Sequence, residues 1–91
     1  ADGAQTTSVG NLTFAIMQKH VRSIVGVEDA ALVATMRLLA ERMKIIVEPT
    51  GCLAPAAALA AAQQWRGRRV GILLSGGNID ISAFARLIGA D

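Results

Sequence analysis

The residues best suited to chemistry in this chain of 91 residues lie in the glycine turn at residues 75–78. Ser75 supplies a hydroxyl and Asn78 an amide, while the two glycines between them allow the backbone to come close to a ligand. The turn follows the unbroken apolar run of residues 70–74, which is typical of a strand buried on both faces. In open α/β folds, ligands bind at the carboxyl ends of such strands, so this turn is the predicted functional point.

Around this turn the pattern predicts one α/β domain. Helices are expected over residues 13–20, 29–44, 54–64 and 81–88, and strands over residues 24–27 and 70–74. Asp80 or Ser82 could cap the last helix, which directly follows the turn. Two parallel strands joined by a helical crossover would form a right-handed unit of a parallel sheet.

The helix expected over residues 29–44 has the clearest pattern. Its apolar residues recur at alternating steps of four and three and predict one buried stripe: Leu32, Met36, Leu39, Met43 and Ile46. Asp29 is a plausible N-cap for this helix, and Glu28 would be a poor one. Pro49 disfavours helical geometry at Glu48, so the helix must end before that residue.

The following helix has a less certain start. Thr50 could cap a helix that runs through the alanine-rich stretch of residues 54–64. Pro55 would then lie beyond the positions where a missing N–H is harmless. The helix either begins later than Thr50 or bends at the proline.

Composition excludes several classes of function. The formal charge of +2 is too small to favour nucleic acid, and no apolar run approaches the roughly 20 residues of a membrane span. The apolar fraction is 53%, but much of it is alanine, which buries little area. The single cysteine, Cys52, cannot form an internal disulfide, and no secretory signal pattern opens the chain, so a cytoplasmic location is expected. Because the chain opens with alanine rather than methionine, residues 1–91 are interpreted as a single segment of a longer protein.

Five segments together suggest a family. They are residues 1–3, residues 10–16 with their Gly-Asn pair and two apolar positions, residues 41–44, residues 47–51 and residues 75–80. In this order and spacing they resemble the carboxyl-terminal part of the pyridoxal-phosphate-dependent serine/threonine dehydratases. The branch that contains serine racemase and threo-3-hydroxyaspartate ammonia-lyase is the most similar. The resemblance implies a parallel-sheet portion of the α/β fold of the tryptophan-synthase β-subunit type, called fold type II.

The resemblance also implies roles for individual residues. Ser75 would place its hydroxyl on the pyridine nitrogen of the cofactor, and Gly3 would lie against the cofactor ring, where a side chain would clash. Asp2 would lie near the substrate. Glu48 would lie near the edge of the ring, and Gly76 and Gly77 would let the strand end approach the ring closely.

Two departures from the family pattern limit what this segment can do. The lysine that forms the Schiff base is absent, since the only lysines are Lys19 and Lys44, both on predicted helices outside the family's motif. The glycine-rich loop for the cofactor phosphate is also absent, and the metal site of some members would precede the first residue. The resemblance therefore implies no catalytic residue and no metal ligand here.

The implied function belongs to a longer enzyme. That enzyme would be an ammonia-lyase of the dehydratase type, eliminating water and ammonia from a hydroxy amino acid to give a 2-oxo acid. Its cofactor would be pyridoxal 5'-phosphate, and this segment alone would be inactive. The implied partners are the remainder of the enzyme chain, a small amino-acid substrate and further copies in a homo-oligomer, with no nucleic acid or membrane.

An alternative function remains open. The chain could be an autonomous, non-catalytic α/β module that binds a phosphate-bearing ligand at residues 75–78 or serves in assembly. Individual residues also have simpler interpretations: Ser75 in a tight turn, Glu48 as a solvated carboxylate, Cys52 as a buried inert thiol and His20 as a surface residue. The arginines of residues 66–69 are interpreted as a solvated turn.

Overall fold

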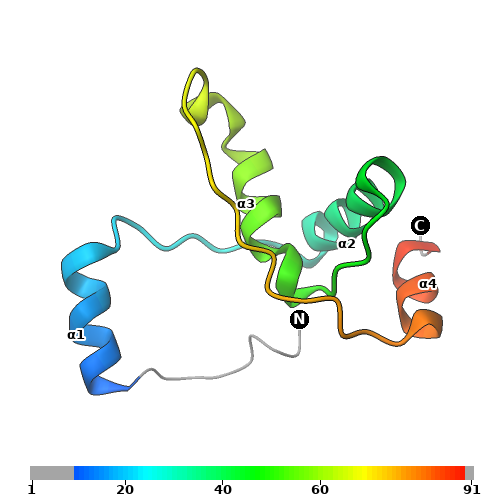
Figure 1. Cartoon of the computed structure of the whole chain (residues 1–91), viewed down its shortest axis with the longest axis horizontal. Coiled ribbons are helices and arrows are strands. Elements are labelled where there is room, and N and C mark those ends of the chain that lie inside the picture. Colours follow the sequence, from blue (N-terminus) through cyan, green and yellow to red (C-terminus); the bar gives the residue numbers. More distant parts are fainter. Residues whose placement is uncertain (1–9, 90–91) are drawn as a thin grey trace.

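The computed structural model describes residues 10–89 and arranges them around a central helix, α2 (Figure 1). The elements are α1 (Asn11–His20), α2 (Asp29–Leu38), the π-helix η2 (Leu39–Met43), the 3-10 helix η3 (Thr50–Cys52), α3 (Leu53–Ala60), the 3-10 helix η4 (Ala62–Trp65) and α4 (Ile81–Gly89). Helices α3 and α4 both contact α2, whereas α1 buries no residue and lies apart at one side of Figure 1. No helix in this part of the chain is both long and apolar enough to cross a membrane.

Helix α2 begins where the sequence predicted, but its N-cap is Glu28 rather than Asp29. Glu28 has extended geometry, with φ −77° and ψ 151°, and its carbonyl accepts the N–H of Leu32 at 3.2 Å. The expectation that Asp29 caps the helix is therefore wrong. Asp29 lies in the first turn instead, where its carboxylate still complements the positive end of the helix dipole.

The predicted apolar stripe is buried only in its first half. Leu32, Met36 and Leu39 are buried, but Met43 is 62% exposed and Ile46 is 44% exposed. The reason is η2, because a π-helix takes more residues per turn than an α-helix and so turns the later positions away from the core.

The end of η2 is a sharp reversal at Lys44. This residue has left-handed geometry, with φ 60° and ψ 36°, which residues other than glycine rarely adopt. The N–H of Ile45 reaches back to the carbonyl of Leu39 at 3.3 Å, and Lys44 Nζ donates to the carbonyl of Glu41 at 2.7 Å. These bonds satisfy carbonyls at the helix end and send the chain into the segment that leads to η3.

The alanine-rich helix begins later than Thr50, at Leu53. A later start was one of the two arrangements expected from the position of Pro55. The chain first makes the 3-10 turn η3, so Pro55 is the third residue of α3 and lies in its first turn, where its missing N–H costs nothing. The expected continuation as an α-helix to Gln64 is wrong. Ala61 leaves helical geometry, with φ −109° and ψ 24°, and the chain continues as the 3-10 helix η4.

The expected strands at residues 24–27 and 70–74 are not formed within the described part of the chain. Both stretches run as segments without helical turns in Figure 1, and no backbone hydrogen bond joins one to the other among residues 10–89. Ile24 is 80% exposed and Leu73 is 85% exposed, so neither stretch is covered as a buried strand would be. A strand is defined by its pairing, and these segments have extended, apolar sequences without a neighbouring strand.

The core is small and centres on one face of α2. Its buried members are Leu32, Met36, Leu39, Val47, Cys52, Ala56 and Phe84. Phe84 brings α4 against this core, and Arg37 of α2 donates to the carbonyl of Ile88 near the end of α4. The core therefore joins α2, η3, α3 and α4 but does not include α1.

Replacing the left-handed Lys44 with glycine is expected to stabilise the chain. Lys44→Gly removes the steric penalty of left-handed geometry and should raise the free energy of unfolding by about 1 kcal/mol, measured by denaturant titration with circular dichroism. Lys44→Ala is the control, because it loses the bond to Glu41 but keeps the penalty, and it should be no more stable than the parent. A destabilised Lys44→Gly variant would contradict this account of the helix end.

Candidate functional site

The predicted functional turn packs against a second segment of the chain. Residues 46–51 cross residues 75–77, and we call this contact the glycine crossing. The N–H of Glu48 donates to the carbonyl of Gly76 at 3.1 Å. This bond places the turn before η3 directly against the residue that follows Ser75, so two sequence motifs become one structural unit.

Gly51 allows the two segments to approach each other. A Cβ at this position would lie 2.8 Å from the carbonyl oxygen of Gly76 and 2.6 Å from Val47 Cγ1. Both distances are far shorter than normal contacts, so any side chain would separate the segments. Sequence reasoning included Gly51 in a motif but gave it no role. The available signal was a glycine directly after the Pro-Thr pair that starts the next helix.

The two glycines of the turn serve the same contact. A Cβ on Gly77 would lie 2.4 Å from the carbonyl oxygen of Ile46, and a Cβ on Gly76 would lie 3.2 Å from Glu48 Oε1. Gly76 also has φ +152°, which other residues rarely adopt. The sequence interpretation assigned these glycines to close approach of a ligand, and the structure adds close packing against residues 46–51 as a second reason for them.

The crossing brings a carboxylate and a hydroxyl to neighbouring positions. The carboxylate of Glu48 is half-buried beside Gly76, and Ser75, the residue before Gly76, is exposed. Glu48 can accept hydrogen bonds, and the hydroxyl of Ser75 can either donate or accept one. Such a pair can bind and orient a polar ring or a small polar molecule.

Cys52 supports the turn from the buried side. Its N–H is shared between the carbonyls of Glu48 at 3.2 Å and Pro49 at 3.0 Å, and its thiol lies 3.9 Å from the carbonyl of Val47. The side chain has no exposed surface, and this burial raises the pKa of the Cys52 thiol. The thiol therefore stays protonated at neutral pH and packs as a small apolar group, as the sequence predicted.

The two other expected site residues are at the start of the chain. Asp2 and Gly3 lie outside the described residues, so their roles rest on the sequence. Within residues 10–89, no group of three or more His, Cys, Asp or Glu side chains is arranged to hold a metal ion.

Comparison with known proteins identifies the family. Residues 1–76 match the family model described as "Pyridoxal-phosphate dependent enzyme". L-threo-3-hydroxyaspartate ammonia-lyase from a Pseudomonas species is 53% identical over 88 residues, which cover 97% of this chain and 28% of that enzyme. Serine racemase from Schizosaccharomyces pombe is 48% identical over 88 residues, covering 97% of this chain and 27% of that enzyme.

A solved structure agrees with this family. The crystal structure of a threonine deaminase from the organism abbreviated T.th. superposes with a TM-score of 0.74 at 42% identity, covering 88% of this chain and 29% of the deaminase. This chain belongs to the family of pyridoxal-phosphate-dependent enzymes, and its fold is a portion of their α/β fold of type II. It spans little more than a quarter of the length of the curated relatives that it matches.

The glycine crossing fits one end of the family's cofactor, pyridoxal phosphate. The exposed hydroxyl of Ser75 suits a pyridine nitrogen, and the glycines leave the backbone beside it free of side chains. Lys44 is bound to a carbonyl at the helix end, and Lys19 is on α1, which contributes nothing to the core. The exposed groups of the glycine crossing therefore suit the ring of the cofactor.

Alanine at Gly77 should disrupt the crossing, whereas alanine at Gly71 should not. Gly77→Ala forces a methyl group onto the carbonyl of Ile46 and should lower the free energy of unfolding by about 1–3 kcal/mol. A Cβ on Gly71 meets no atom within 4 Å, so Gly71→Ala should leave stability unchanged or raise it by up to about 1 kcal/mol. Equal losses for the two variants in a denaturant titration would show that the crossing is not formed.

Proposed function

We propose that residues 1–91 are a single carboxyl-terminal segment of a pyridoxal-phosphate-dependent ammonia-lyase of the serine/threonine dehydratase type. The observation that carries this proposal is the glycine crossing, which brings Glu48 next to Gly76, the residue that follows Ser75. The proposal is supported by relatives named L-threo-3-hydroxyaspartate ammonia-lyase and L-threonine ammonia-lyase, which are 53% and 34% identical to this chain.

In this proposal, Ser75 contacts the pyridine nitrogen of the cofactor and Glu48 lies at the edge of the ring. Gly76 leaves room for the ring beside the glycine turn, Gly3 lies against its face, and Asp2 is on the substrate side. When bound, the cofactor withdraws electrons from the substrate carbon that loses a proton. A hydroxyl does not keep the ring nitrogen protonated as a carboxylate would, so the ring withdraws electrons more mildly, which suits elimination of water from a hydroxy amino acid.

The remainder of the enzyme would supply the reactive lysine and the phosphate-binding loop. The reaction would remove water and then ammonia from a small hydroxy amino acid and leave a 2-oxo acid. The complete enzyme would act in the cytoplasm as a homo-oligomer. The alternative of an autonomous ligand-binding module is less well supported, because the apolar side chains of residues 70–74 are left exposed in this chain.

A chimeric enzyme tests the proposed function. In the Pseudomonas L-threo-3-hydroxyaspartate ammonia-lyase, the 88 matched residues are replaced with those of this chain. The chimera should bind pyridoxal phosphate, seen in its visible absorbance, and should release ammonia from L-threo-3-hydroxyaspartate. A chimera that folds and binds the cofactor but releases no ammonia from hydroxy amino acids would contradict the proposed reaction.

Within the same chimera, Ser75→Ala should lower kcat/KM about tenfold or more, because the ring nitrogen loses its hydrogen-bond partner. Ser82→Ala is the matched control, since it removes the same hydroxyl from an exposed position on α4 and should leave kcat/KM unchanged. An unaffected Ser75→Ala chimera would rule out the proposed contact with the cofactor.

A further inference from the structure

Three arginines lie in the turn that follows η4, and we call residues 65–69 the arginine turn. Arg66 has φ −56° and ψ 128°, and Gly67 has φ 77°. The N–H of Arg68 donates to the carbonyl of Trp65 at 2.9 Å. These values define a type II β-turn, whose third residue needs a positive φ and is therefore best filled by glycine. The Arg-Gly-Arg-Arg sequence thus has a defined backbone geometry.

The arginine turn projects from the rest of the molecule. Figure 1 shows it as the yellow loop beyond the end of α3, away from α2 and α4. Arg66, Arg68 and Arg69 are exposed, and none of their guanidinium groups has a hydrogen bond or an ion pair within residues 10–89. A guanidinium group presents its N–H donors in a planar fork that matches the oxygens of phosphate. The turn therefore offers three such forks to solvent.

Negative charge is absent from the sequence around this turn. No Asp or Glu occurs between Glu48 and Asp80, so residues 49–79 carry the charge of the three arginines alone. The formal charge of the whole chain, +2, conceals this uneven distribution. Like charges that lie close together repel one another, and an anion bound between them relieves the repulsion.

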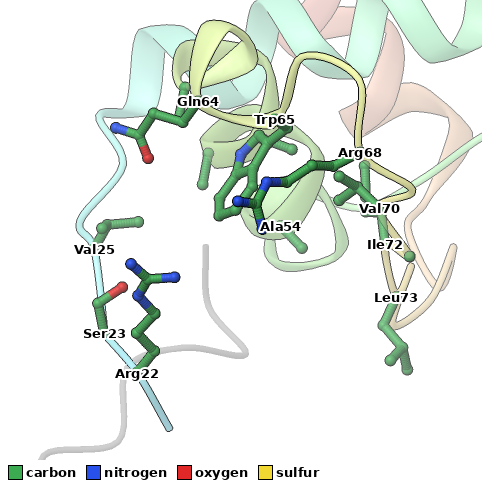
Figure 2. Close-up of a pocket in the computed structure, with 14 residues that line it drawn as sticks. Arg22, Ser23, Val25, Ala54, Gln64, Trp65, Arg68, Val70, Ile72 and Leu73 are labelled. Carbon is green, nitrogen blue, oxygen red and sulfur yellow. The ribbon is translucent and has the colours of Figure 1, made fainter.

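A fourth arginine faces the turn from another segment. Arg22 and Arg68 are the only charged residues that line the cleft between residues 22–25 and residues 70–73, and Trp65 lines it as well. Figure 2 shows both guanidinium groups directed toward the space between these segments. An anion bound there would meet guanidinium groups from two separate parts of the chain.

We propose that the arginine turn and Arg22 form a binding site for an oligophosphate, a ligand that carries two or more phosphate groups. One phosphate group pairs with one or two guanidinium groups, whereas several phosphate groups in one ligand can reach more of them. Residues 70–74 separate this site from Ser75, so it is distinct from the groups that suit the cofactor ring. The inference does not depend on the proposed reaction.

Other anions match this arrangement less well. A nucleic acid duplex calls for positive charge spread along a longer surface, but here the charge is confined to one turn and one facing side chain. A monocarboxylate carries a single charge and would leave most of the guanidinium groups unpaired. An oligophosphate concentrates several negative charges in a small volume, as the clustered arginines require.

The fluorescence of Trp65 provides the test, because it is the only tryptophan in the chain and begins the arginine turn. Titration of the purified chain with inorganic tripolyphosphate at constant ionic strength should give a saturable change, with a dissociation constant on the order of 1 mM or below. Orthophosphate should bind about tenfold or more weakly, since it reaches fewer guanidinium groups. Calorimetry on the chimeric enzyme, loaded with pyridoxal phosphate to fill the cofactor site, repeats the comparison in a complete enzyme chain.

A second ligand distinguishes two sources of phosphate. Fructose 1,6-bisphosphate is titrated in the same assays, because its phosphate groups are esters on a sugar and not linked to each other. Saturable binding of either compound supports the site. The tighter of the two shows whether the site prefers an inorganic chain or a phosphate ester.

Matched charge variants locate the site. Arg68→Gln should weaken tripolyphosphate binding about fivefold or more, and Arg22→Gln should weaken it several-fold. Arg86→Gln removes the same charge from an exposed position on α4 and should change the dissociation constant less than about twofold.

Alanine at Gly67 tests the geometry of the turn while keeping every charge. A Cβ on Gly67 meets no atom within 4 Å, so only its φ of +77° opposes the substitution. Gly67→Ala should weaken binding several-fold, because the turn must change shape. Gly71→Ala has equally open surroundings and no such φ, so it should bind tripolyphosphate as the parent does.

The inference is wrong if neither phosphate compound gives a saturable signal in the chain or in the chimera, because the arginines would then form only a solvated turn. Equal weakening by Arg68→Gln and Arg86→Gln would also overturn it. The ammonia release of the chimera is measured without added phosphate compounds, so these outcomes do not bear on the proposed function.

Discussion

The close approach of two glycine-bearing segments is the constraint on which the candidate site depends. The N–H of Glu48 can reach the carbonyl of Gly76 only because Gly51 and Gly77 carry no side chains at the contact. A single methyl group at either glycine would meet backbone at less than 3 Å. The contact therefore explains the glycines by packing, and it brings Glu48 next to the residue that follows Ser75.

The elements before the crossing determine where it forms. Helix α2 is fixed by its buried face, and the π-turn with the left-handed Lys44 directs the chain from the end of that helix toward η3. Cys52 and Val47 then anchor the turn in the core from its buried side. Helix α4 follows the glycine turn and returns to α2 through Phe84, so both segments of the crossing are tied to the same helix.

Sequence patterns predicted the elements that depend on local periodicity and turn chemistry. The helices predicted over residues 13–20 and 81–88 are present as Asn11–His20 and Ile81–Gly89, and the break before Pro49 follows from proline geometry. The helix predicted over residues 29–44 is an α-helix only over Asp29–Leu38 and continues as a π-helix. The π-turn was not predictable, because nothing in the apolar spacing marks an extra residue in one turn, and it turned Met43 outward. The prediction of two strands was wrong for a different reason. An apolar run indicates burial, but a strand forms only where a neighbouring strand pairs with it. Motifs predicted Ser75, Gly76 and Glu48 as site residues, whereas the packing role of Gly51 required the position of a distant backbone.

Hydrogen exchange of the Glu48 amide, followed by nuclear magnetic resonance on the 91-residue chain, tests the glycine crossing most directly. The Glu48 N–H precedes η3 and its acceptor in this structure is Gly76, so its protection reports on this contact alone. We expect this amide to exchange far more slowly than that of Ile72, which makes no backbone bond among the described residues. Equal, fast exchange of both amides would show that the crossing does not form. It would also contradict the placement of Glu48 next to Gly76 in the candidate site.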